Sequence, residues 1–379
     1  MKILYFYPEN PLLSNQGNHV RAISILNYFK DRKIEVDFVS EQSDNFSHKE
    51  IEILKGENLI SAGFLLKKYK RKNNKIQYFF KYSLPNKFLN QIKLFNRIRF
   101  GHQKAFNTIL KENSYDFIII SYACWAELIK NNTNLKNAKT VIDTHDFLTA
   151  QFKNHKTFQL GKFFEKEITL LKMFNKILVI SIEEKYLFSQ FTNSEVHLAT
   201  HSLPNNFDKT LENKKYDIIY VASENEHNKK SIKWFFEKVY PLLNKNLKIL
   251  IIGSIINSID EYPNVEKIKF VKVLDDFYSN SKVVICPMLS GTGLKIKVIE
   301  ALSFGLPVVC NDKGIDGFLN KTNNGCLVTN SPIEFSNYIN ELLTNLAFYE
   351  KTSNLAKEYF LHNNDTTAAY IKFDKIFQV

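Results

Sequence analysis

Short apolar runs recur along the whole chain and alternate with amphipathic stretches. In the first half they predict strands at 2–7, 34–40, 115–121, 139–144, 176–181 and 195–200. Residues 19–30, between two of these runs, place apolar side chains at the three-to-four spacing of a helix. The second half repeats the rhythm, with strands predicted at 216–223, 247–254, 267–273, 282–288, 306–312 and 325–330. Strands that alternate with helices indicate parallel sheets covered on both faces.

The repeated rhythm predicts an α/β chain of two Rossmann-like, doubly wound domains. We expect the first domain at 1–200, a polar linker interrupted by Pro204 at 201–215, and the second domain at 216–360. The remainder, 361–379, is expected as a C-terminal helix. Open parallel sheets bind ligands at the carboxyl ends of their strands, so two such domains predict a ligand cleft between them.

This architecture is shared by sugar transferases, nucleotide-sugar epimerases, dehydrogenases and periplasmic-type binding proteins. A dehydrogenase needs a GxGxxG turn after its first strand, with an acidic residue about 20 positions later. The stretch after the first predicted strand contains a single glycine, Gly17, and the stretch 221–231 contains none. The dehydrogenase class is therefore disfavoured.

The amino-acid composition further restricts the class of protein. Apolar residues make up 44% of the chain and charged residues 24%, which is typical of a globular protein. The four cysteines are scattered without CxxC spacing, which favours reduced packing residues in a cytosolic protein over a metal site or disulfides. The N-terminus is broken too early by Pro8 for a signal peptide, and no apolar run approaches the ~20 residues of a membrane span. We expect a cytoplasmic protein, soluble or peripheral at the inner face of the membrane.

Positive charge is concentrated in one segment, which we expect to be a basic insertion in the acceptor-binding first domain. Residues 58–111 contain 13 Lys and Arg and no Asp or Glu, whereas the whole chain has a net charge of +12. Phe and Tyr are interleaved with these cations. The combination suits an anionic membrane surface, a lipid-linked acceptor or a nucleic acid, and a solvated face over an aromatic core is the plain alternative. The candidate acceptor or membrane residues are Lys67, Lys68, Lys70, Arg71 and Lys72.

The stretch GTGLKIKVIEALSFGLPVV (291–309) carries a candidate nucleotide site. Gly291 and Gly293 lie where a strand turns into a helix, so exposed N–H groups can approach a phosphate closely. Lys295 and Lys297 add positive charge beside the helix N-terminus, which is locally unfavourable unless an anion binds there. Glu300 supplies a carboxylate that can accept two hydrogen bonds from a ribose diol.

A second candidate lies in VIDTHDF (141–147). His145 follows the carboxyl end of a predicted buried strand and is flanked by Asp143 and Asp146. A neutral imidazole there can hydrogen-bond a sugar hydroxyl or stabilise developing positive charge, and Asp143 can orient it. These three residues are the candidate catalytic group.

The sequence resembles the retaining, family-4 type of GT-B glycosyltransferase. That family has a Glu-x7-Glu motif followed by Ala and Gly-x-Pro-Val, after a strand that ends in Pro. The residues that match are Pro287, Gly293, Glu300, Ala301, Gly305, Pro307 and Val308. The first glutamate is replaced by Thr292, so the contact to the donor sugar must be made differently. The form GTGLKIKxxEA is similar to a variant branch in which Lys297 helps to hold the diphosphate.

The resemblance has further implications. Lys229 or Lys230 stands near the position of a phosphate ligand, and Gly17 falls in the loop that faces the donor diphosphate. The counterpart of His145 points at the reacting sugar. The resemblance also implies a GT-B fold with a C-terminal helix that crosses back to the first domain. It implies a front-face reaction with retention of configuration, in which the donor phosphate helps to deprotonate the acceptor.

These observations predict a glycosyltransferase of surface polysaccharide biosynthesis. We expect it to transfer a sugar from a nucleotide-diphosphate sugar to a glycan or lipid-linked acceptor at an anionic membrane surface, without nucleic acid as a partner. No Asp-x-Asp triplet is present, so neither a metal nor a cofactor is expected. Two alternatives remain open at this point: a nucleotide-sugar epimerase of the same fold, and a non-catalytic glycan-binding protein that keeps the fold.

Overall fold

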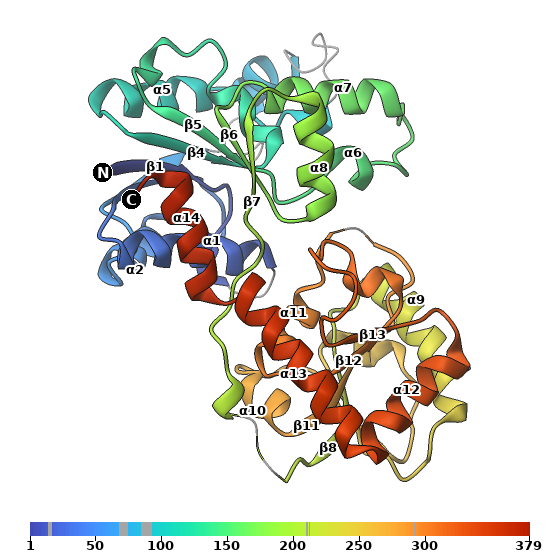
Figure 1. Cartoon of the computed structure of the whole chain (residues 1–379). Coiled ribbons are helices and arrows are strands. Elements are labelled where there is room, and N and C mark those ends of the chain that lie inside the picture. Colours follow the sequence, from blue (N-terminus) through green and yellow to red (C-terminus); the bar gives the residue numbers. More distant parts are fainter. Residues whose placement is uncertain (14–16, 68–74, 85–92, 210, 212, 292) are drawn as a thin grey trace. The chain divides into compact units, whose positions relative to one another are not determined.

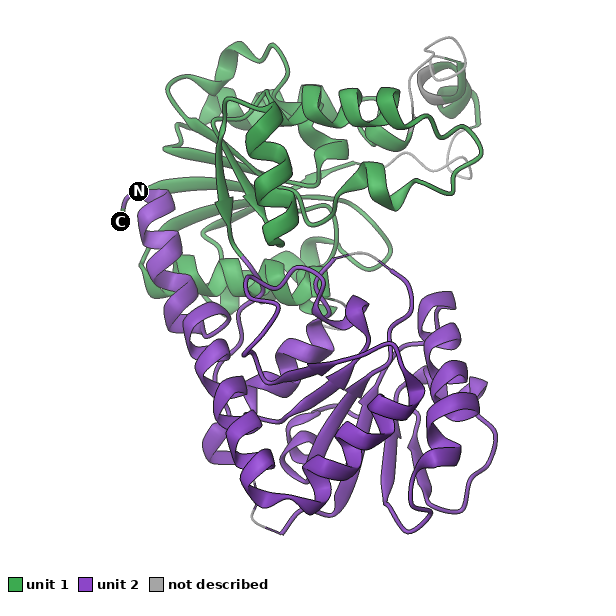
Figure 2. Ribbon diagram, turned by 45° about the vertical axis from the view of Figure 1, so that its right-hand side comes forward, with its two compact units in different colours: residues 1–199, 379 green, residues 200–378 purple. Residues whose placement is uncertain are grey.

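The computed structural model describes residues 1–13, 17–67, 75–84, 93–209, 211, 213–291 and 293–379. These residues form two compact units, Met1–Ala199 with Val379, and Thr200–Gln378 (Figure 2). Each unit contains one parallel β-sheet with helices packed on its faces (Figure 1). This is the doubly wound arrangement that the alternating pattern predicts.

The sheet of the first unit has seven strands in the order β3-β2-β1-β4-β5-β6-β7, and every pair of neighbours is parallel. The strands are β1 (Lys2–Phe6), β2 (Glu35–Glu41), β3 (Ala62–Leu66), β4 (Phe117–Ser121), β5 (Lys139–Asp143), β6 (Lys176–Val179) and β7 (Glu195–Leu198). The helices are α1 (Gly17–Asp31), α2 (His48–Gly56), α3 (Lys75–Tyr78), α5 (His102–Glu112), α6 (Leu148–Gln151), α7 (Leu160–Leu171) and α8 (Ile182–Phe191).

The segment 58–111 is partly integrated into this sheet. Its residues Ala62–Leu66 form the edge strand β3, which pairs with β2 from Asp37↔Ala62 to Glu41↔Leu66. Its last residues form α5, which buries Phe106, Ile109 and Leu110. The segment expected to be a basic insertion thus contributes a strand and a helix to the first unit.

The sheet of the second unit has six strands in the order β10-β9-β8-β11-β12-β13, again all parallel. The strands are β8 (Tyr216–Val221), β9 (Ile249–Ile252), β10 (Val265–Ile268), β11 (Ser281–Cys286), β12 (Val308–Cys310) and β13 (Cys326–Val328). The helices are α9 (Glu226–Trp234), α10 (Asp275–Ser279), α11 (Ile296–Ser303), α12 (Pro332–Thr344), α13 (Leu346–Asn363) and α14 (Thr366–Phe377).

Alternation along β8 explains how the second sheet is covered. Ile219 packs into one core with α11 and α13, while Ile218 and Tyr220 pack into the opposite core with α9 and α12. Successive side chains of a strand point to opposite faces, so an uninterrupted apolar strand needs helices on both sides. This arrangement fixes the N-terminal ends of α9 and α11 at the carboxyl ends of the strands.

The strand predicted at 267–273 is misplaced. The structure has β10 at Val265–Ile268, and Phe270 is 81% exposed. The partner strand β9 ends at Ile252, because the next residue, Gly253, has φ +111° and turns the backbone away. Pairing therefore stops although the alternating pattern continues through Lys272.

Candidate active site

In the first unit, the candidate site is built from residues that follow three neighbouring strands. Glu9 follows β1, Tyr122 follows β4 and His145 follows β5. These strands are adjacent and parallel in the order β1-β4-β5, so their carboxyl ends meet at one edge of the sheet. That edge is where doubly wound folds bind ligands.

A buried ion pair underlies this edge. Asp143, the last residue of β5, is fully buried and accepts three hydrogen bonds from Arg21 of α1. The Arg21 Nε lies 2.9 Å from both carboxylate oxygens, and Nη2 lies 2.6 Å from Oδ1. Burial alone would raise the pKa of Asp143, but the Arg21 charge and the adjacent His145 outweigh it and hold the pKa well below its usual range. Asp143 is thus an anion held in place by α1.

His145 is positioned by Asp143 and by an aromatic stack. Its Nε2 lies 3.0 Å from Asp143 Oδ2, at ion-pair distance but without the alignment of a hydrogen bond. Its ring stacks on that of Tyr122 with centroids 4.3 Å apart and an interplanar angle of 17°. Both residues adopt left-handed backbone conformations, φ 59° for His145 and 67° for Tyr122. Such strain in bulky residues persists only where the surroundings impose it.

Glu9 completes this cluster, and sequence reasoning did not find it. Its Oε2 accepts a 2.9 Å hydrogen bond from Asn18 Nδ2 and lies 3.2 Å from His19 Nε2. Asn18 Nδ2 is also 2.9 Å from the Tyr122 hydroxyl. The Glu9 side chain remains 43% exposed, so a ligand can reach it. Gly17, the predicted loop residue, is the first residue of α1 and lies directly before Asn18.

Asp146 is placed differently from Asp143. It is half-buried, and burial raises its pKa, an effect that His145 only partly opposes. Two buried glutamates interact with it: burial raises the pKa of Glu167 and of Glu184 to about 7, and Asp146 adds to both shifts. Glu167 also accepts hydrogen bonds from the amides of Leu148 and Thr149 at the start of α6. Asp146 therefore belongs to a buried acidic group rather than to the Arg21 ion pair.

In the second unit, the candidate site surrounds the N-terminus of α11. Gly291 and Gly293 have φ +104° and +72°, which favour glycine, and the helix begins at Ile296 with Lys295 as its N-cap. Thr292 lies outside the described residues. The loop follows β11, at the carboxyl edge of the sheet. The strand–glycine loop–helix arrangement expected for a phosphate site is present.

Two lysine side chains gather at this helix end. Lys297 Nζ lies 3.2 Å from Asn228 Oδ1 and 4.6 Å from the centroid of the Tyr220 ring, and burial lowers its pKa. An ammonium has three N–H donors, so the bond to Asn228 leaves donors for an anion. Lys295 is also buried, and its Nζ donates to the Gly293 carbonyl at 2.6 Å.

Glu300 lies one turn after Lys297 on α11. Its Oε2 accepts a 3.0 Å hydrogen bond from the buried Tyr278 hydroxyl. Burial raises the pKa of Glu300, whereas Tyr278 and Lys297 act in the opposite direction. A carboxylate that is fixed in this way and retains free acceptor positions can bind neighbouring hydroxyl groups.

The two lysines predicted on the turn after β8 are not part of this cluster. Lys229 Nζ lies 3.4 Å from a carboxylate oxygen of Glu224 and equally far from one of Glu226, and Lys230 is exposed. Asn228, which precedes these two lysines on α9, is the residue that contacts Lys297. The assignment of Lys229 and Lys230 to the phosphate site is therefore not supported by their positions.

His227 is a further residue that sequence reasoning missed. Its Nδ1 lies 2.8 Å from Ser290 Oγ, and its ring lies beside Gly291, 3.7 Å from the position that a Cβ would take there. The ring thus braces the glycine loop. In the sequence, only the position of His227 in the first turn of the helix after β8 could have indicated this role.

The basic segment is only partly described. Lys67 is exposed, whereas Lys68, Lys70, Arg71 and Lys72 lie outside the described residues. Further along, Ile76, Phe79 and Phe80 are exposed by 73%, 50% and 61%. Within the described ranges, no group of three or more His, Cys, Asp or Glu is arranged to hold a metal ion. None of the helices traced in the structure is both long and apolar enough to cross a membrane.

Comparison with solved structures establishes the fold class. A sucrose-phosphate synthase from Thermosynechococcus elongatus superposes with a TM-score of 0.71 at 13% identity, covering 100% of this chain and 98% of that one. Anabaena Alr3699/HepE, solved in complex with UDP, gives a TM-score of 0.70 at 12% identity and covers 100% of both chains. TarM gives 0.68 at 14% identity, with 100% and 99% covered. The fold is GT-B, as the resemblance implied.

The sequence comparisons find a family match in the second unit. Residues 215–345, which contain α9, α11 and the glycine loop, match the model of the family described as "Glycosyl transferases group 1". A Klebsiella pneumoniae protein described as "Uncharacterized 44.6 kDa protein in cps region" is 21% identical over 314 residues, which is 74% of this chain and 79% of that protein. The predicted class, a glycosyltransferase of the GT-B fold that resembles group 1, is confirmed.

Proposed function

We propose that the protein transfers a sugar, with retention of configuration, from a nucleotide-diphosphate sugar to a glycan or lipid-linked acceptor during surface polysaccharide synthesis. The observation that carries this proposal is the cluster of Lys295, Lys297 and Glu300 at the start of α11, inside the stretch that matches the family. HepE has been solved in complex with UDP and with UDP-glucose, which makes a uridine nucleotide the first donor to test.

The second unit supplies the groups that suit a nucleotide diphosphate. In our proposal, the amides of the glycine loop and the ammonium groups of Lys295 and Lys297 stabilise the leaving diphosphate, and Glu300 accepts hydrogen bonds from the ribose. Charge that develops on the leaving oxygens is stabilised most strongly by donors that are already fixed. The contacts of Lys295 to Gly293 and of Lys297 to Asn228 and Tyr220 provide that fixation.

The first unit supplies a group for the sugar. We assign His145 to the reacting sugar, where it stabilises the positive charge of an oxocarbenium-like transition state, and Asp143 to the positioning of His145. The bond between the anomeric carbon and the diphosphate oxygen breaks as the acceptor oxygen bonds to the same face. The acceptor proton passes to the departing phosphate oxygen, so no protein carboxylate is needed as a nucleophile.

Two observations support a surface glycan acceptor at an anionic membrane. The Klebsiella relative is described by its place in a cps region. The segment 58–111 combines its 13 cations with exposed Ile76, Phe79 and Phe80. Basic residues interleaved with exposed aromatic and aliphatic side chains are typical of segments that bind the interface of anionic membranes.

Nucleotide release from a panel of nucleotide sugars tests this function. We expect one or a few donors, first among them UDP-sugars, to give slow release without acceptor and faster release with a lipid-linked glycan. An epimerase would convert the sugar while it remains attached to the nucleotide. A binding protein without activity would release nothing from any donor, and either result would contradict the proposal.

Replacing Glu300 with alanine should weaken binding of the donor nucleotide. A hydrogen bond to a charged group contributes ~1.5–3 kcal/mol, so we expect the dissociation constant of UDP to rise by roughly one to two orders of magnitude. Isothermal titration calorimetry measures the change, and Glu341→Ala, at an exposed position of α12, is the matched control. Equal UDP affinities of wild type and Glu300→Ala, with the fold intact, would contradict the ribose assignment.

The basic segment should bind anionic vesicles in a salt-dependent manner. Attraction between exposed charges weakens as the Debye length falls to ~3 Å at 1 M salt. Replacing Lys67, Lys68, Lys70, Arg71 and Lys72 with Gln should reduce flotation with anionic vesicles and leave donor hydrolysis unchanged. Replacing the exposed Lys269 and Lys272 with Gln in the second unit is the control. Absence of flotation of the wild type at low salt would remove the membrane from the proposal.

A further inference from the structure

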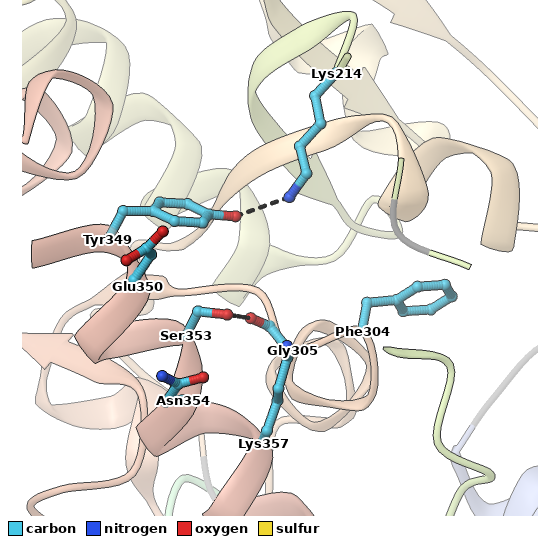
Figure 3. Close-up of a pocket in the computed structure, with 8 residues that line it drawn as sticks. All are labelled: Lys214, Phe304, Gly305, Tyr349, Glu350, Ser353, Asn354 and Lys357. Carbon is cyan, nitrogen blue, oxygen red and sulfur yellow. Dashed lines mark hydrogen bonds between the residues drawn. The ribbon is translucent and has the colours of Figure 1, made fainter. Parts of the chain in front are cut away.

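A pocket of about 360 Å³ lies in the second unit, at the opposite end of α11 from Lys295 and Lys297. Its walls come from the segment that precedes β8, the end of α11 and one side of α13 (Figure 3). The lining residues are Lys214, Phe304, Gly305, Tyr349, Glu350, Ser353, Asn354 and Lys357. Lys214 precedes β8, so the pocket lies at the amino end of that strand, whereas the candidate donor site lies at the carboxyl ends. The pocket is therefore separate from the donor site.

Lys214 points into this pocket and is fixed by Tyr349 (Figure 3). Its Nζ lies 2.8 Å from the Tyr349 hydroxyl, which in turn donates to the Lys282 carbonyl at 3.2 Å. Burial, and then the charges of Lys357 and Lys282, lower the pKa of Lys214 to about 8. The ammonium is thus held in an environment that disfavours its charge.

Lys357 brings a second ammonium to the same pocket. Its side chain lies directly over Gly305, which has φ +65°, and a Cβ added there would lie 2.6 Å from Lys357 Cε. The Ser353 hydroxyl donates to the Gly305 carbonyl at 2.6 Å, which closes the end of α11 beneath the two lysines. The absence of a side chain at Gly305 allows Lys357 to line the pocket.

In the part of the chain that the structure describes, the surrounding charges do not balance these two cations. Among the described residues, neither Lys214 nor Lys357 has a carboxylate within ion-pair distance. The nearby Lys282 is paired with Asp217 at 2.8 Å, and Glu350 is exposed at the pocket rim. The C-terminus of α11 contributes about half a negative charge, which is too little to balance two ammonium groups. An anionic ligand would remove this imbalance.

We propose that this pocket binds a small phosphate monoester, whose phosphate group is contacted by the ammonium groups of Lys214 and Lys357. A doubly charged phosphate matches two ammonium groups, and Asn354 supplies an amide for the remaining oxygen acceptors. The pocket is larger than a phosphate ion alone requires, and its volume falls within the range of small-molecule sites.

Chemical labelling of Lys214 tests the site in the wild-type protein. At pH 8 roughly half of the Lys214 side chains are unprotonated, so isotope-labelled acetic anhydride should acylate Lys214 despite its burial. Saturating glycerol 3-phosphate should slow this reaction at least severalfold and leave exposed Lys351 of α13 unaffected, as followed by peptide mass spectrometry. A labelling rate of Lys214 that does not change with glycerol 3-phosphate would overturn the proposal.

Variants separate this pocket from the donor site. Lys214→Met and Lys357→Met should each weaken binding of glycerol 3-phosphate about tenfold or more, Lys214→Arg should retain it, and Lys351→Met should not change it. Lys297→Met, in the donor site, should leave protection of Lys214 intact. If wild type, Lys214→Met and Lys357→Met bound glycerol 3-phosphate with equal affinity, the phosphate would bind elsewhere. The same would follow if only Lys297→Met abolished the protection of Lys214 from acylation. Inorganic phosphate as a second probe shows whether the organic part contributes.

Discussion

Replacing His145 with alanine is expected to lower kcat by about two to three orders of magnitude, with little change in donor affinity. A fixed group that stabilises transition-state charge contributes roughly 10²–10³-fold in kcat when it is removed singly. His145 is held in a left-handed conformation, stacked on Tyr122 and placed 3.0 Å from Asp143, which is far more fixation than a loop histidine needs for stability. Steady-state kinetics and nucleotide titration separate the two effects.

His155→Ala is the matched control for this prediction. His155 is an exposed histidine of the same unit, with its contact to Thr157, and its removal should leave kcat unchanged. An unchanged kcat in His145→Ala would contradict a catalytic role of the cluster at the end of β5. A fall in nucleotide affinity with unchanged kcat would instead assign His145 to ground-state binding.

Replacing Arg21 with methionine is expected to destabilise the first unit by ~3–5 kcal/mol, because it leaves the fully buried Asp143 carboxylate without its partner. Urea unfolding measures the loss. The double variant Arg21→Met with Asp143→Asn should recover part of it, since the uncompensated charge is then absent.

Arg32→Met, at a half-buried position in the turn directly after α1, is the comparison and should cost at most ~1 kcal/mol. A loss in Arg21→Met no larger than that in Arg32→Met would show that Asp143 does not depend on the ion pair. The same conclusion would follow if the loss of stability in the double variant equalled the sum of the losses in the two single variants.

The fold could be predicted because its signals are local. Apolar runs such as 216–223 and 282–288 overlap β8 and β11, and the C-terminal helix expected at 361–379 contains α14. The edge strand β3 was missed, since its burial is partial and it is embedded in the basic segment. The strand at 267–273 was misplaced, because strand pairing depends on where the partner ends and not only on alternation.

The candidate site could be predicted in part for the same reason. The loop and helix with Gly293, Lys297 and Glu300 are contiguous in sequence, so spacing alone brought them together. Contacts such as Arg21 to Asp143 and Asn18 to Tyr122 join residues more than 100 positions apart, and no local pattern indicates them. Lys229 was assigned from the family resemblance, but its helical position turns it toward Glu224 and Glu226.

Proton NMR of UDP-glucose incubated with the protein is the most direct test of retaining sugar transfer. We expect UDP to be released while free glucose first appears as the α anomer, before mutarotation, and a lipid-linked glycan acceptor to accelerate UDP release. A sugar that is epimerised while still attached to UDP, or a β anomer as the first product, would contradict it.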